Sequence, residues 1–445
     1  MSYDVVIIGA GMSGLAAGIR LAYYEKKVCI LEKHSRPGGM NSFYNLQERQ
    51  FDVGLHAITN YVKKGTKNAP LSKLLKQLKL KYEDFALCEQ KSSLISFPEV
   101  SLCFTNNFKT FEQEIFDKFP SQKDNFCDLC KHISQFDELN LNSTPVSARE
   151  VVSSFISDPL LVEMLFCPLS YYGSAKEDDM DFDQFVIMFK SIFMEGFARP
   201  ETGVRQIINV LLKKYKACGG ELRLNTGVKY INSRNGKVKS ITLKNGNVLE
   251  TKKILSSAGY VETMRLTGEK IQPDNDRIGK LSFVETIYVL DREPAELGID
   301  KAIIFYNDSK KFLYRKPDDM VDLSSGVICC PNNFYFDNSL PEGMIRTTHI
   351  ANFDLWDNPS SNDYRAQKIF WQKKSLKKIC GVVPDFTSSM VFTDMFTPKT
   401  IKRFTGRLNG AVYGSPRKIK NGKTPVENLF ICGTDQGFMG IIGAM

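Results

Sequence analysis

Three glycines near the start of the chain have the spacing of a phosphate-binding turn. They are Gly9, Gly11 and Gly14, and they follow an apolar run, residues 4–8, with the composition of a strand buried on both faces. The first glycine of this pattern permits a tight turn, the second lets a pyrophosphate lie against the backbone, and the third lets a helix pack close to the strand. That helix is expected from about Met12 to Glu25, with its N-terminal N–H groups directed at the phosphates.

A carboxylate follows at the distance expected for binding a ribose. Val28 to Leu31 is a second buried strand, and Glu32 ends it, roughly 20 residues past the glycines. A carboxylate there binds the ribose hydroxyls and disfavours a 2′-phosphate, so the unit is expected to hold FAD or NAD rather than NADP. A glycine-rich turn without a ligand is the alternative, but the strand, the helix and the carboxylate all fit the binding motif. The candidate cofactor contacts of this unit are Gly9, Gly11, Met12, Ser13, Gly14, Glu32 and Lys33.

The size and composition of the chain indicate a globular protein of several domains. Its 445 residues allow two or three domains, and its net charge of +9 permits contact with an anionic membrane surface without requiring it. Lysine is spread along the chain, with no basic stripe interleaved with aromatics, so nucleic acid is not an expected partner. No other segment than the first glycine unit approaches 20 uninterrupted apolar residues, and the first strand starts at residue 3. We therefore expect neither a membrane-spanning helix nor a signal peptide.

The 11 cysteines do not form a regular framework. Cys127 and Cys130 make one C-x-x-C with His132 nearby, but a metal site would need a second pair at suitable spacing, so no metal centre is expected. A redox dithiol is a second interpretation, and two ordinary thiols are the expected one. This cysteine usage indicates a reducing, intracellular compartment. We predict a cytoplasmic protein, with peripheral contact at the cytoplasmic face of the membrane left open.

Two more regions place glycines where a cofactor could approach the backbone. After the first unit the chain continues through RPGG, residues 36–39, to FDVGLH, residues 51–56. Near the other end stand FTPKT, residues 396–400, and GAVYG, residues 410–414. They are followed by NLFICGTD, residues 428–435, which has the pattern of a buried strand that turns into a helix.

These motifs together resemble the flavin-dependent amine oxidase and phytoene desaturase superfamily. FDVGLH and the TP…GAVYG element are most similar to its carotenoid isomerase and retinol saturase branch. The resemblance covers nearly the whole chain and is strongest at residues 3–56, 200–259 and 396–445. It implies FAD, not NAD, as the cofactor. It also implies an α/β fold of the glutathione-reductase type, in which a Rossmann FAD-binding domain is interleaved with an α+β substrate-binding domain.

The resemblance divides the chain into five segments. The FAD-binding domain is expected at residues 1–84, 200–270 and 396–445, and the substrate domain at residues 85–199, which are helix-rich, and 271–395. The final helix of the fold is expected where the sequence reaches its end, so we expect either a longer chain or a disordered terminus.

The resemblance also implies cofactor contacts beyond the first unit. Val228 is expected beside the adenine, Asp435 at the pyrophosphate and ribityl chain, and the backbone from Gly440 to Ile442 at the pyrimidine end of the flavin. The full set of these further contacts is Arg36, Gly38, Gly39, Met40, His56, Val228, Ala258, Gly433, Asp435, Gly440, Ile441 and Ile442.

Aromatic residues raise a choice between packing and ligand binding. Phe182, Phe185, Val186, Phe189, Ile192 and Phe193 recur at helical spacing. A core helix would show this pattern, and so would the wall of a tunnel for a long apolar substrate or a face lying on a membrane. Trp356 and Trp371 could face membrane lipid, but packing is expected.

The expected chemistry belongs to the flavin, and the protein supplies binding, orientation and electrostatics. A desaturase moves a hydride from a substrate carbon to flavin N5, a saturase does the reverse, and an isomerase uses reduced flavin without net oxidation. Each needs the substrate carbon held in a dry pocket. His56 is the candidate acid or base because the cofactor motif places it near the isoalloxazine, although a structural histidine fits as well. His349 and Tyr413 are weaker candidates.

We therefore predict an FAD-dependent oxidoreductase acting on C–C or C=C bonds of an isoprenoid, carotenoid-like or other long-chain unsaturated lipid. A flavin amine oxidase or a protoporphyrinogen-oxidase-like enzyme is the alternative. A lipid escort resembling the Rab GDP-dissociation inhibitors, which use no flavin, is a third reading, but intact Glu32, Gly38-Gly39 and residues 433–435 argue against it. The sequence leaves open the exact substrate, the direction of the redox change, the electron acceptor and the oligomeric state.

Overall fold

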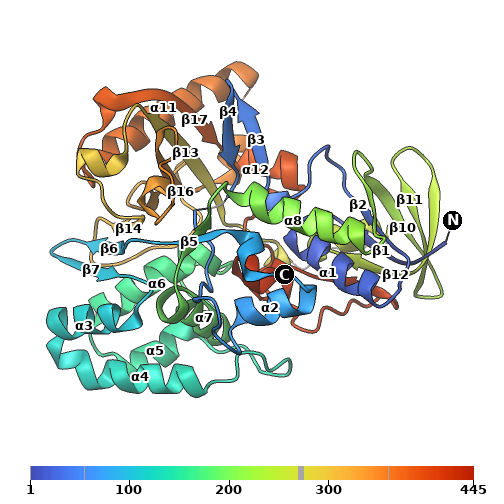
Figure 1. Ribbon diagram of the computed structural model, residues 1–445, viewed down its shortest axis with the longest axis horizontal. Helices are drawn as coiled ribbons and strands as arrows, with labels where there is room; N and C mark the ends of the chain where they lie inside the picture. The colour runs from blue at the N-terminus through green and yellow to red at the C-terminus, as the bar shows by residue number, and fades with distance from the viewer. Residues whose placement is uncertain (1, 55, 269–274, 359) are drawn as a thin grey trace.

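Two seven-stranded β-sheets organise the molecule. The computed structural model describes residues 2–54, 56–268, 275–358 and 360–445. The first sheet lies on the right of Figure 1 beside the N-terminus, the second lies at the upper left, and a group of helices lies below the second sheet. The α/β fold class predicted from the sequence is confirmed, with a Rossmann-type sheet joined to a second, mixed sheet.

The first sheet contains the predicted strand–helix–strand unit. Its strands run in the order β10-β11-β12-β1-β2-β9, and β18 also pairs with β12. β1 is parallel to β2 and to β12, as a right-handed crossover through a helix requires. The strands are β1 Ser2–Ile8, β2 Val28–Leu31, β9 Glu221–Arg223, β10 Val228–Arg234, β11 Lys237–Leu243, β12 Val248–Ser256 and β18 Leu429–Ile431.

One strand of this sheet is longer than the sequence predicts. Residues 248–250 and 253–257 read as two strands, but β12 is continuous because it pairs with β1 along its length, from Ser2 opposite Glu250 to Ile8 opposite Ser256. Asn235-Gly236 and Asn245-Gly246, dipeptides typical of hairpin turns, lie where β10, β11 and β12 join.

Three helices cover one face of this sheet: α1 Met12–Tyr23, α2 Pro70–Leu78 and α8 Val204–Ala217. Figure 1 shows α1 and α8 side by side. Leu15 and Ile19 of α1 and Ile207 and Leu211 of α8 belong to the same buried cluster as Ile30 of β2. In both helices these residues are four positions apart, the spacing of an amphipathic helix, so each helix packs one apolar face against the sheet. This packing holds the glycine turn in place at the end of β1.

The second sheet supplies the other side of the molecule. Its order is β17-β13-β16-β15-β14-β6-β7, antiparallel except where β14 pairs with β6. All nine residues of β13 are buried. Residues 282–290 pair with residues 343–351 of β16 over the full length of both strands. The strands are β6 Ser93–Phe97, β7 Val100–Phe104, β13 Ser282–Leu290, β14 Ile303–Asn307, β15 Ser325–Cys329, β16 Gly343–Ala351 and β17 Met390–Phe396.

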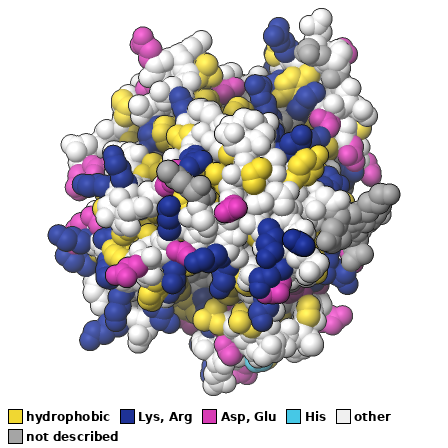
Figure 2. Space-filling view, turned by 90° about the vertical axis from the view of Figure 1, so that its right-hand side faces the viewer, with side chains coloured by type: hydrophobic (Ala, Val, Ile, Leu, Met, Phe, Trp, Pro, Cys, Tyr) yellow, Lys and Arg dark blue, Asp and Glu magenta, His cyan; other side chains and the backbone are white. Residues whose placement is uncertain are grey.

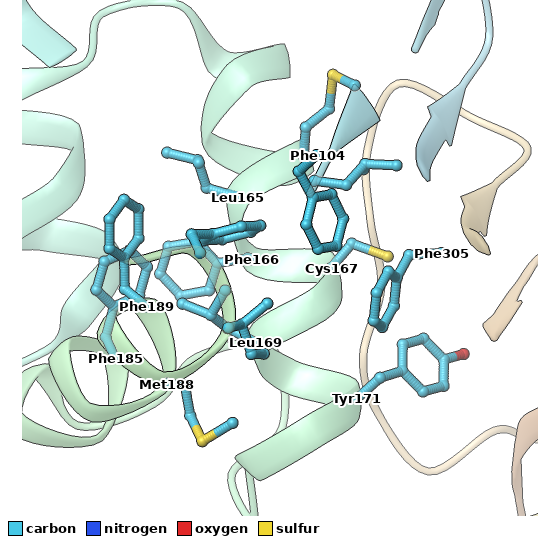
Figure 3. Packing of buried hydrophobic residues seen from close by; sticks show 14 of the residues in the cluster. Phe104, Leu165, Phe166, Cys167, Leu169, Tyr171, Phe185, Met188, Phe189 and Phe305 are labelled. Carbon is cyan, nitrogen blue, oxygen red and sulfur yellow. The ribbon is translucent and has the colours of Figure 1, made fainter. Parts of the chain in front are cut away.

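A helical group packs beneath the second sheet around a core rich in phenylalanine. Its helices are α3 Phe108–Lys118, α4 Lys123–Gln135, α5 Ala148–Phe155, α6 Pro159–Gly173, α7 Phe182–Phe189 and the π-helix Lys190–Glu195. α6 starts with Pro159 in its first turn and Asp158 capping its N-terminus, a combination typical of helix starts. Figure 3 shows side chains of α6 lying between Phe185 and Phe189 of α7 on one side and Phe104 and Phe305 of the sheet on the other.

The apolar stripe of residues 182–193 belongs to this core. All six of its side chains are buried in the core cluster, and none of them lines the cavity described below. The tunnel-wall and membrane-face interpretations are therefore wrong for these residues. Trp356 and Trp371 are also buried, as expected from packing. Cys127 and Cys130 are free thiols on α4, and burial raises the pKa of Cys130.

The remaining strands and α-helices lie outside the two large sheets and the helical group. They are β3 Phe43–Leu46, β4 Arg49–Asp52, β5 Leu87–Glu89, β8 Ala198–Pro200, α9 Tyr260–Leu266, α10 Phe353–Asp357, α11 Ser361–Ile379, α12 Pro398–Thr405 and α13 Gly440–Ala444. Of these, β3, α9, α12 and α13 contribute to the cavity described below. Among the helices of the described ranges, none has both the length and the apolar composition needed to cross a membrane. On the face in Figure 2, basic side chains are interspersed with acidic and apolar ones.

Truncation of Phe193 should destabilise the helical group. Its ring stacks on Phe111 with centroids 4.2 Å apart and meets Phe104 and Phe189 edge-on. We expect Phe193→Ala to cost about 3–5 kcal/mol of unfolding free energy, because it leaves a cavity in a closed core. Denaturant titration followed by circular dichroism measures this. Phe370→Ala, at a half-exposed phenylalanine of α11, should shift the transition far less, and equal shifts would contradict the packing described here.

Candidate functional site

A cavity of about 1090 Å³ lies between the two sheets. Most of the expected cofactor residues line it, although they come from segments far apart in the sequence. They are Gly9, Gly11, Met12, Ser13, Glu32, Lys33, Arg36, Gly38, Gly39, Met40, His56, Val228, Ala258, Gly433, Gly440 and Ile441. We call the part lined by these residues other than His56 the nucleotide half. The inner half is lined by His56, Tyr172, Phe283, Glu285, Val327, Thr348, Val412 and Met439.

The glycine turn has the geometry that the motif requires. Gly9 has a φ of +97°, which disfavours any side chain there. A Cβ on Gly14 would lie 2.2 Å from the carbonyl oxygen of Gly9, so this glycine lets α1 approach the turn, and it does not itself line the cavity. A Cβ on Gly11 would meet no atom within 4 Å. The backbone at Gly11 therefore borders open space in the cavity, as a phosphate cradle should.

Glu32 is fixed at the end of β2. Its Oε2 accepts a hydrogen bond from Ala10 N at 2.9 Å, and its Oε1 accepts one from His34 N at 3.0 Å. A carboxylate has about four acceptor positions, so both oxygens keep capacity for ribose hydroxyls. The second glycine pair is tied to the first turn, because Gly38 N donates to Ala10 O at 2.8 Å. Arg36 lies at the rim, where its guanidinium donates to Phe43 O at 3.3 Å.

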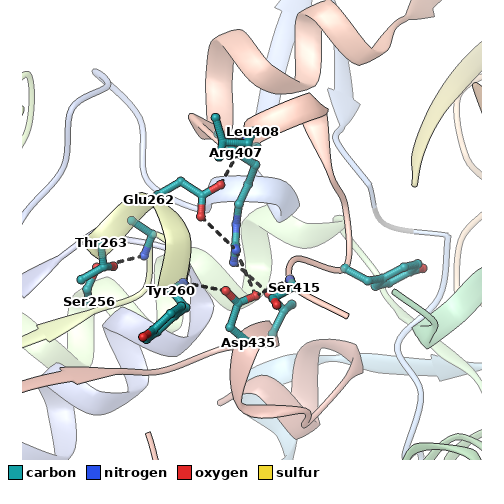
Figure 4. Close-up of polar contacts among 12 residues, drawn as sticks. Ser256, Tyr260, Glu262, Thr263, Arg407, Leu408, Ser415 and Asp435 are labelled. Carbon is teal, nitrogen blue, oxygen red and sulfur yellow. Dashed lines mark hydrogen bonds and ion pairs between the residues drawn. The ribbon is translucent and has the colours of Figure 1, made fainter. Parts of the chain in front are cut away.

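The structure corrects the expected role of Asp435. Its carboxylate is buried outside the cavity lining, where it accepts from Arg407 at 3.1 Å, Tyr260 N at 2.6 Å and Ser415 N at 3.0 Å (Figure 4). Burial alone would raise the pKa of Asp435, but the positive charge of Arg407 lowers it below its usual value. Asp435 therefore holds Arg407 rather than reaching into the cavity. Ile442 is likewise packed in the core against α1.

Arg407 is a cavity residue that the sequence analysis missed. Besides Asp435 it contacts Glu262 at 3.8 Å and donates to Thr434 Oγ1 at 2.8 Å. Its guanidinium therefore stays fixed beside the nucleotide half as a buried positive charge. Arg407 lies just after α12, outside every motif, and only the folded chain brings it to Asp435. The one signal in the sequence is its position between the two C-terminal motifs.

His56 belongs to a buried polar cluster at the inner half. Its Nε2 lies 3.0 Å from Thr348 Oγ1 and 3.7 Å from Glu285 Oε2. Leu55 of the same motif lies outside the described residues. Burial lowers the pKa of His56, an effect that Glu285 opposes. Burial alone would raise the pKa of Glu285, but the charge of Arg346 and the contact with His56 bring it to about 2.

The register of β13 and β16 explains why these groups share one face. Glu285 stands opposite Thr348, and Arg346 is two residues earlier on the same strand, so the three side chains point to the same side of the sheet. The Arg346 guanidinium donates to Glu285 Oε1 at 2.7 Å through Nε. His349 points to the opposite side, where its Nε2 meets the Tyr306 hydroxyl at 2.9 Å. His349 does not line the cavity and is no longer a candidate acid or base.

A second buried ion pair holds the segment that carries His56. Arg199 of β8 donates to Asp52 Oδ2 at 2.6 Å and to the carbonyl oxygen of His56 at 2.9 Å. Asp52 Oδ1 accepts from Val204 N, at the start of α8, at 3.1 Å. Arg346 also donates to Asp52 O at 3.1 Å. The two ion pairs therefore fix the His56 backbone between the two sheets. Arg199, Glu285 and Arg346 carry no local motif, so the sequence analysis missed them.

Comparisons with known proteins agree with this architecture. A family description for an NAD(P)-binding Rossmann-like domain matches residues 7–78. The chain is 24% identical over 478 residues to a chloroplastic prolycopene isomerase of Arabidopsis thaliana, covering 97% of this chain and 78% of that protein. It is 22% identical over 518 residues to an all-trans-retinol 13,14-reductase of Danio rerio, covering 99% of this chain and 84% of that protein.

Solved structures share the fold. An oxidoreductase from Methanosarcina mazei superposes on this chain with a TM-score of 0.67 at 15% identity, covering 100% of this chain and 98% of that one. Identity at this level shows the common fold alone, and it gives the interleaved arrangement of the two sheets an experimental counterpart.

Two alanine substitutions separate folding from ligand binding at the glycine turn. Gly11→Ala should leave the unfolding midpoint near wild type, because its new methyl group meets no protein atom, and should abolish retention of a dinucleotide. Gly14→Ala should destabilise the protein, because its methyl group would overlap Gly9 O. Thermal unfolding and release of bound nucleotide after denaturation measure the two effects. Normal nucleotide content in Gly11→Ala would contradict the cradle.

The burial of neutral His56 predicts a loss of stability in mild acid. Its pKa is lower in the folded than in the unfolded protein, so its contribution is complete above about pH 6.5 and declines as the pH falls below that value. Between pH 7.5 and 5.5 the wild type should lose up to about 1.4 kcal/mol more than His56→Gln. Glu285 does not interfere, because its own contribution declines only below about pH 4.5. Equal losses in urea titrations would show that folding does not lower the pKa of His56.

Proposed function

We propose that this chain, an oxidoreductase similar to the carotenoid isomerase and retinol saturase branch of the FAD-dependent amine oxidase superfamily, holds FAD and acts on carbon–carbon double bonds of a long unsaturated lipid. The relatives described above confirm the resemblance predicted from the motifs. The observation that carries the proposal is a single cavity that connects the glycine turn to a buried polar cluster. The proposal covers desaturation, saturation and cis–trans isomerisation.

The nucleotide half fits a dinucleotide. The open backbone at Gly11 would receive the pyrophosphate, Glu32 would bind the ribose, and Val228 would lie beside the adenine; all three residues line the cavity, which supports these assignments. Arg407 adds a fixed positive charge next to these anionic groups. FAD would supply the site at which a hydride is accepted or donated, which no side chain of the protein can provide.

The inner half suits an apolar chain next to a proton-exchanging group. Phe283, Val327, Val412 and Met439 line it and would exclude water from the reacting carbons. His56 is the side chain we assign to proton exchange, through Nε2, because its buried imidazole is neutral and Glu285 would stabilise the protonated form. Glu285 and Arg346 act by positioning His56 and fixing its electrostatic surroundings.

The charges at the inner half favour this reading over an amine oxidase. An amine substrate would profit from a free carboxylate, but Glu285, the acidic side chain there, is already paired with Arg346. A lipid escort without flavin would have no use for the open cradle at Gly11 or for the fixed Glu32. Turnover of an amine without turnover of a polyene would reverse this order.

Domain organisation and location belong to the same proposal. We assign the FAD-binding domain to residues 1–84, 200–270 and 396–445 and the substrate domain to the intervening segments. A cytoplasmic protein with peripheral membrane contact would agree with the exposed side chains of Ile369 and Phe370, which stand beside lysines on α11. A net oxidation or reduction would also need an electron acceptor or donor, which would be a molecule other than the lipid substrate.

An absorbance spectrum of the purified protein, before and after anaerobic photoreduction, tests the proposal. We expect a flavin band that bleaches on reduction and FAD in the released fraction. Incubation with polyenes should then change the substrate mass by two hydrogens or change its geometry alone. A colourless protein that also refuses added FAD would overturn the enzyme assignment and favour the lipid escort.

A matched variant shows whether the flavin occupies the predicted cradle. Glu32→Gln keeps the size of the side chain but removes its charge, and should raise the dissociation constant for FAD about tenfold or more, because a charge-assisted hydrogen bond becomes a neutral one. Glu48→Gln, on the turn between β3 and β4, serves as the control and should retain wild-type affinity. Equal affinity of both variants would place the ribose elsewhere.

A further inference from the structure

The outer side of α11 combines basic and apolar side chains. On its inner side the helix packs against the second sheet through Trp371, Ser375 and Ile379, which are buried and spaced four residues apart. The opposite side carries exposed side chains, which include Arg365, Ile369, Phe370, Lys373, Lys374 and Lys377. We call these six residues the basic face of α11.

The positive charges of this face are not neutralised by neighbouring carboxylates. Two other lysines of the helix are paired: Lys368 Nζ lies 3.7 Å from Asp394 Oδ1, and Lys378 Nζ lies 2.8 Å from Asp308 Oδ2. Among the described residues, no carboxylate forms an ion pair with any of the four basic side chains of the face. The sequence gives the reason, because residues 364–384 contain neither Asp nor Glu. The face therefore presents four positive charges to the solvent.

Two large apolar side chains are exposed among these charges. Ile369 is 54% exposed and Phe370 is 48% exposed. The Lys374 ammonium lies 4.5 Å from the centroid of the Phe370 ring, close enough for a cation–π contact. A single exposed apolar residue is ordinary. An adjacent pair surrounded by lysines is typical of helices that lie on a lipid surface, where apolar side chains enter the acyl boundary and lysines reach the phosphate groups.

The cavity reaches the surface beside this face. Phe404 of α12 lines the cavity and is 52% exposed, and Lys368, the residue before Ile369, lines the cavity as well. α11 and α12 are joined here, because the Tyr364 hydroxyl lies 2.7 Å from Oγ1 of Thr397, the residue before α12. The opening of the cavity and the basic face are therefore neighbours.

We propose that the basic face of α11 docks on an anionic lipid surface and that the neighbouring opening admits the lipid substrate from it. The unpaired charges and the exposed apolar pair support the docking. The entrance rests on the proposed function, because only an enzyme that converts a lipid gains from a cavity that opens beside the bilayer. A nucleic acid or an acidic protein would match the charges but would make no use of Ile369 and Phe370.

Co-sedimentation of the protein as purified with lipid vesicles tests the docking surface. The vesicles contain phosphatidylcholine alone or equal parts of phosphatidylcholine and phosphatidylglycerol. We expect binding to the anionic vesicles, weakened by salt because salt screens the charges. Lys373→Gln/Lys374→Gln/Lys377→Gln should lower the affinity at least about tenfold, because three attractive charges are lost. Ile369→Ser/Phe370→Ser should lower it at least about tenfold at unchanged net charge, because no apolar side chain enters the bilayer.

Matched variants away from α11 serve as controls. Tyr230→Ser/Val248→Ser removes two exposed apolar side chains from β10 and β12, which lie on the opposite side of Figure 1 from α11. Lys213→Gln/Lys216→Gln/Lys239→Gln removes the same number of exposed positive charges from α8 and β11. Both controls should bind anionic vesicles like the wild type.

The way in which a polyene is presented tests the entrance. The probe is all-trans-retinol, supplied to the flavin-loaded protein in anionic vesicles or in detergent micelles. Ile369→Ser/Phe370→Ser should slow conversion from vesicles about tenfold and leave conversion from micelles at the wild-type rate. Equal rates of variant and wild type with vesicles would overturn the entrance.

The outcomes separate this inference from the proposed function. Equal wild-type binding to both kinds of vesicle would overturn the docking surface. Loss of binding in the lysine variant with wild-type binding in Ile369→Ser/Phe370→Ser would also overturn it, in favour of an acidic macromolecule as the partner. Both results leave the polyene assignment standing, because conversion in micelles tests that assignment. If protein that retains its flavin converts the probe in neither form, the polyene assignment and the entrance fail together, while vesicle binding still decides the docking surface.

Discussion

Two buried ion pairs, Glu285–Arg346 and Asp52–Arg199, hold the short segment that ends in His56. Glu285 and Arg346 stand on adjacent strands of the second sheet, and Arg346 also donates to Asp52 O. Arg199 of β8 binds the Asp52 carboxylate and donates to the carbonyl oxygen of His56. Removing two charges from water is expensive, and apolar residues of similar volume are often as stable in such places. The two pairs therefore act through geometry: they fix the position of the segment between the sheets and with it the shape of the cavity that this segment borders.

This geometry also sets the electrical character of the cavity. Arg346 satisfies Glu285 so fully that the carboxylate is ionised deep in the fold, and His56 stays neutral beside it. In the nucleotide half the signs of the charges are reversed, because Asp435 and Glu262 hold the positively charged Arg407 at the cavity wall. One region therefore suits phosphate and the other an apolar molecule, within a single connected space.

Local sequence patterns predicted the first strand–helix–strand unit, whereas most of the inner half depends on long-range strand pairing that such patterns do not reveal. The glycine turn, Glu32 and the cap of α6 depend on neighbours within about 20 residues, and the structure has them where the patterns place them. The polar cluster depends on the register between β13 and β16, which the sequence does not state. Asp435 was assigned to the cofactor because the motif gives its residue type but not Arg407, its partner. The stripe of residues 182–193 shows the same limit, since periodicity identifies a buried face and not what is buried against it.

Because β18 is synthesised long after β12, these two strands can pair only late in translation. β1, α1 and β2 leave the ribosome early, whereas β18 and α13, which complete the wall beside them, emerge only after the whole second sheet. A nascent chain therefore exposes the apolar edge of β12 and an unfinished cradle from the completion of β12 until β18 emerges. An unpaired strand edge is prone to aggregation, and a cavity wall that is completed last makes capture of a ligand a late event that coincides with closure of the sheet.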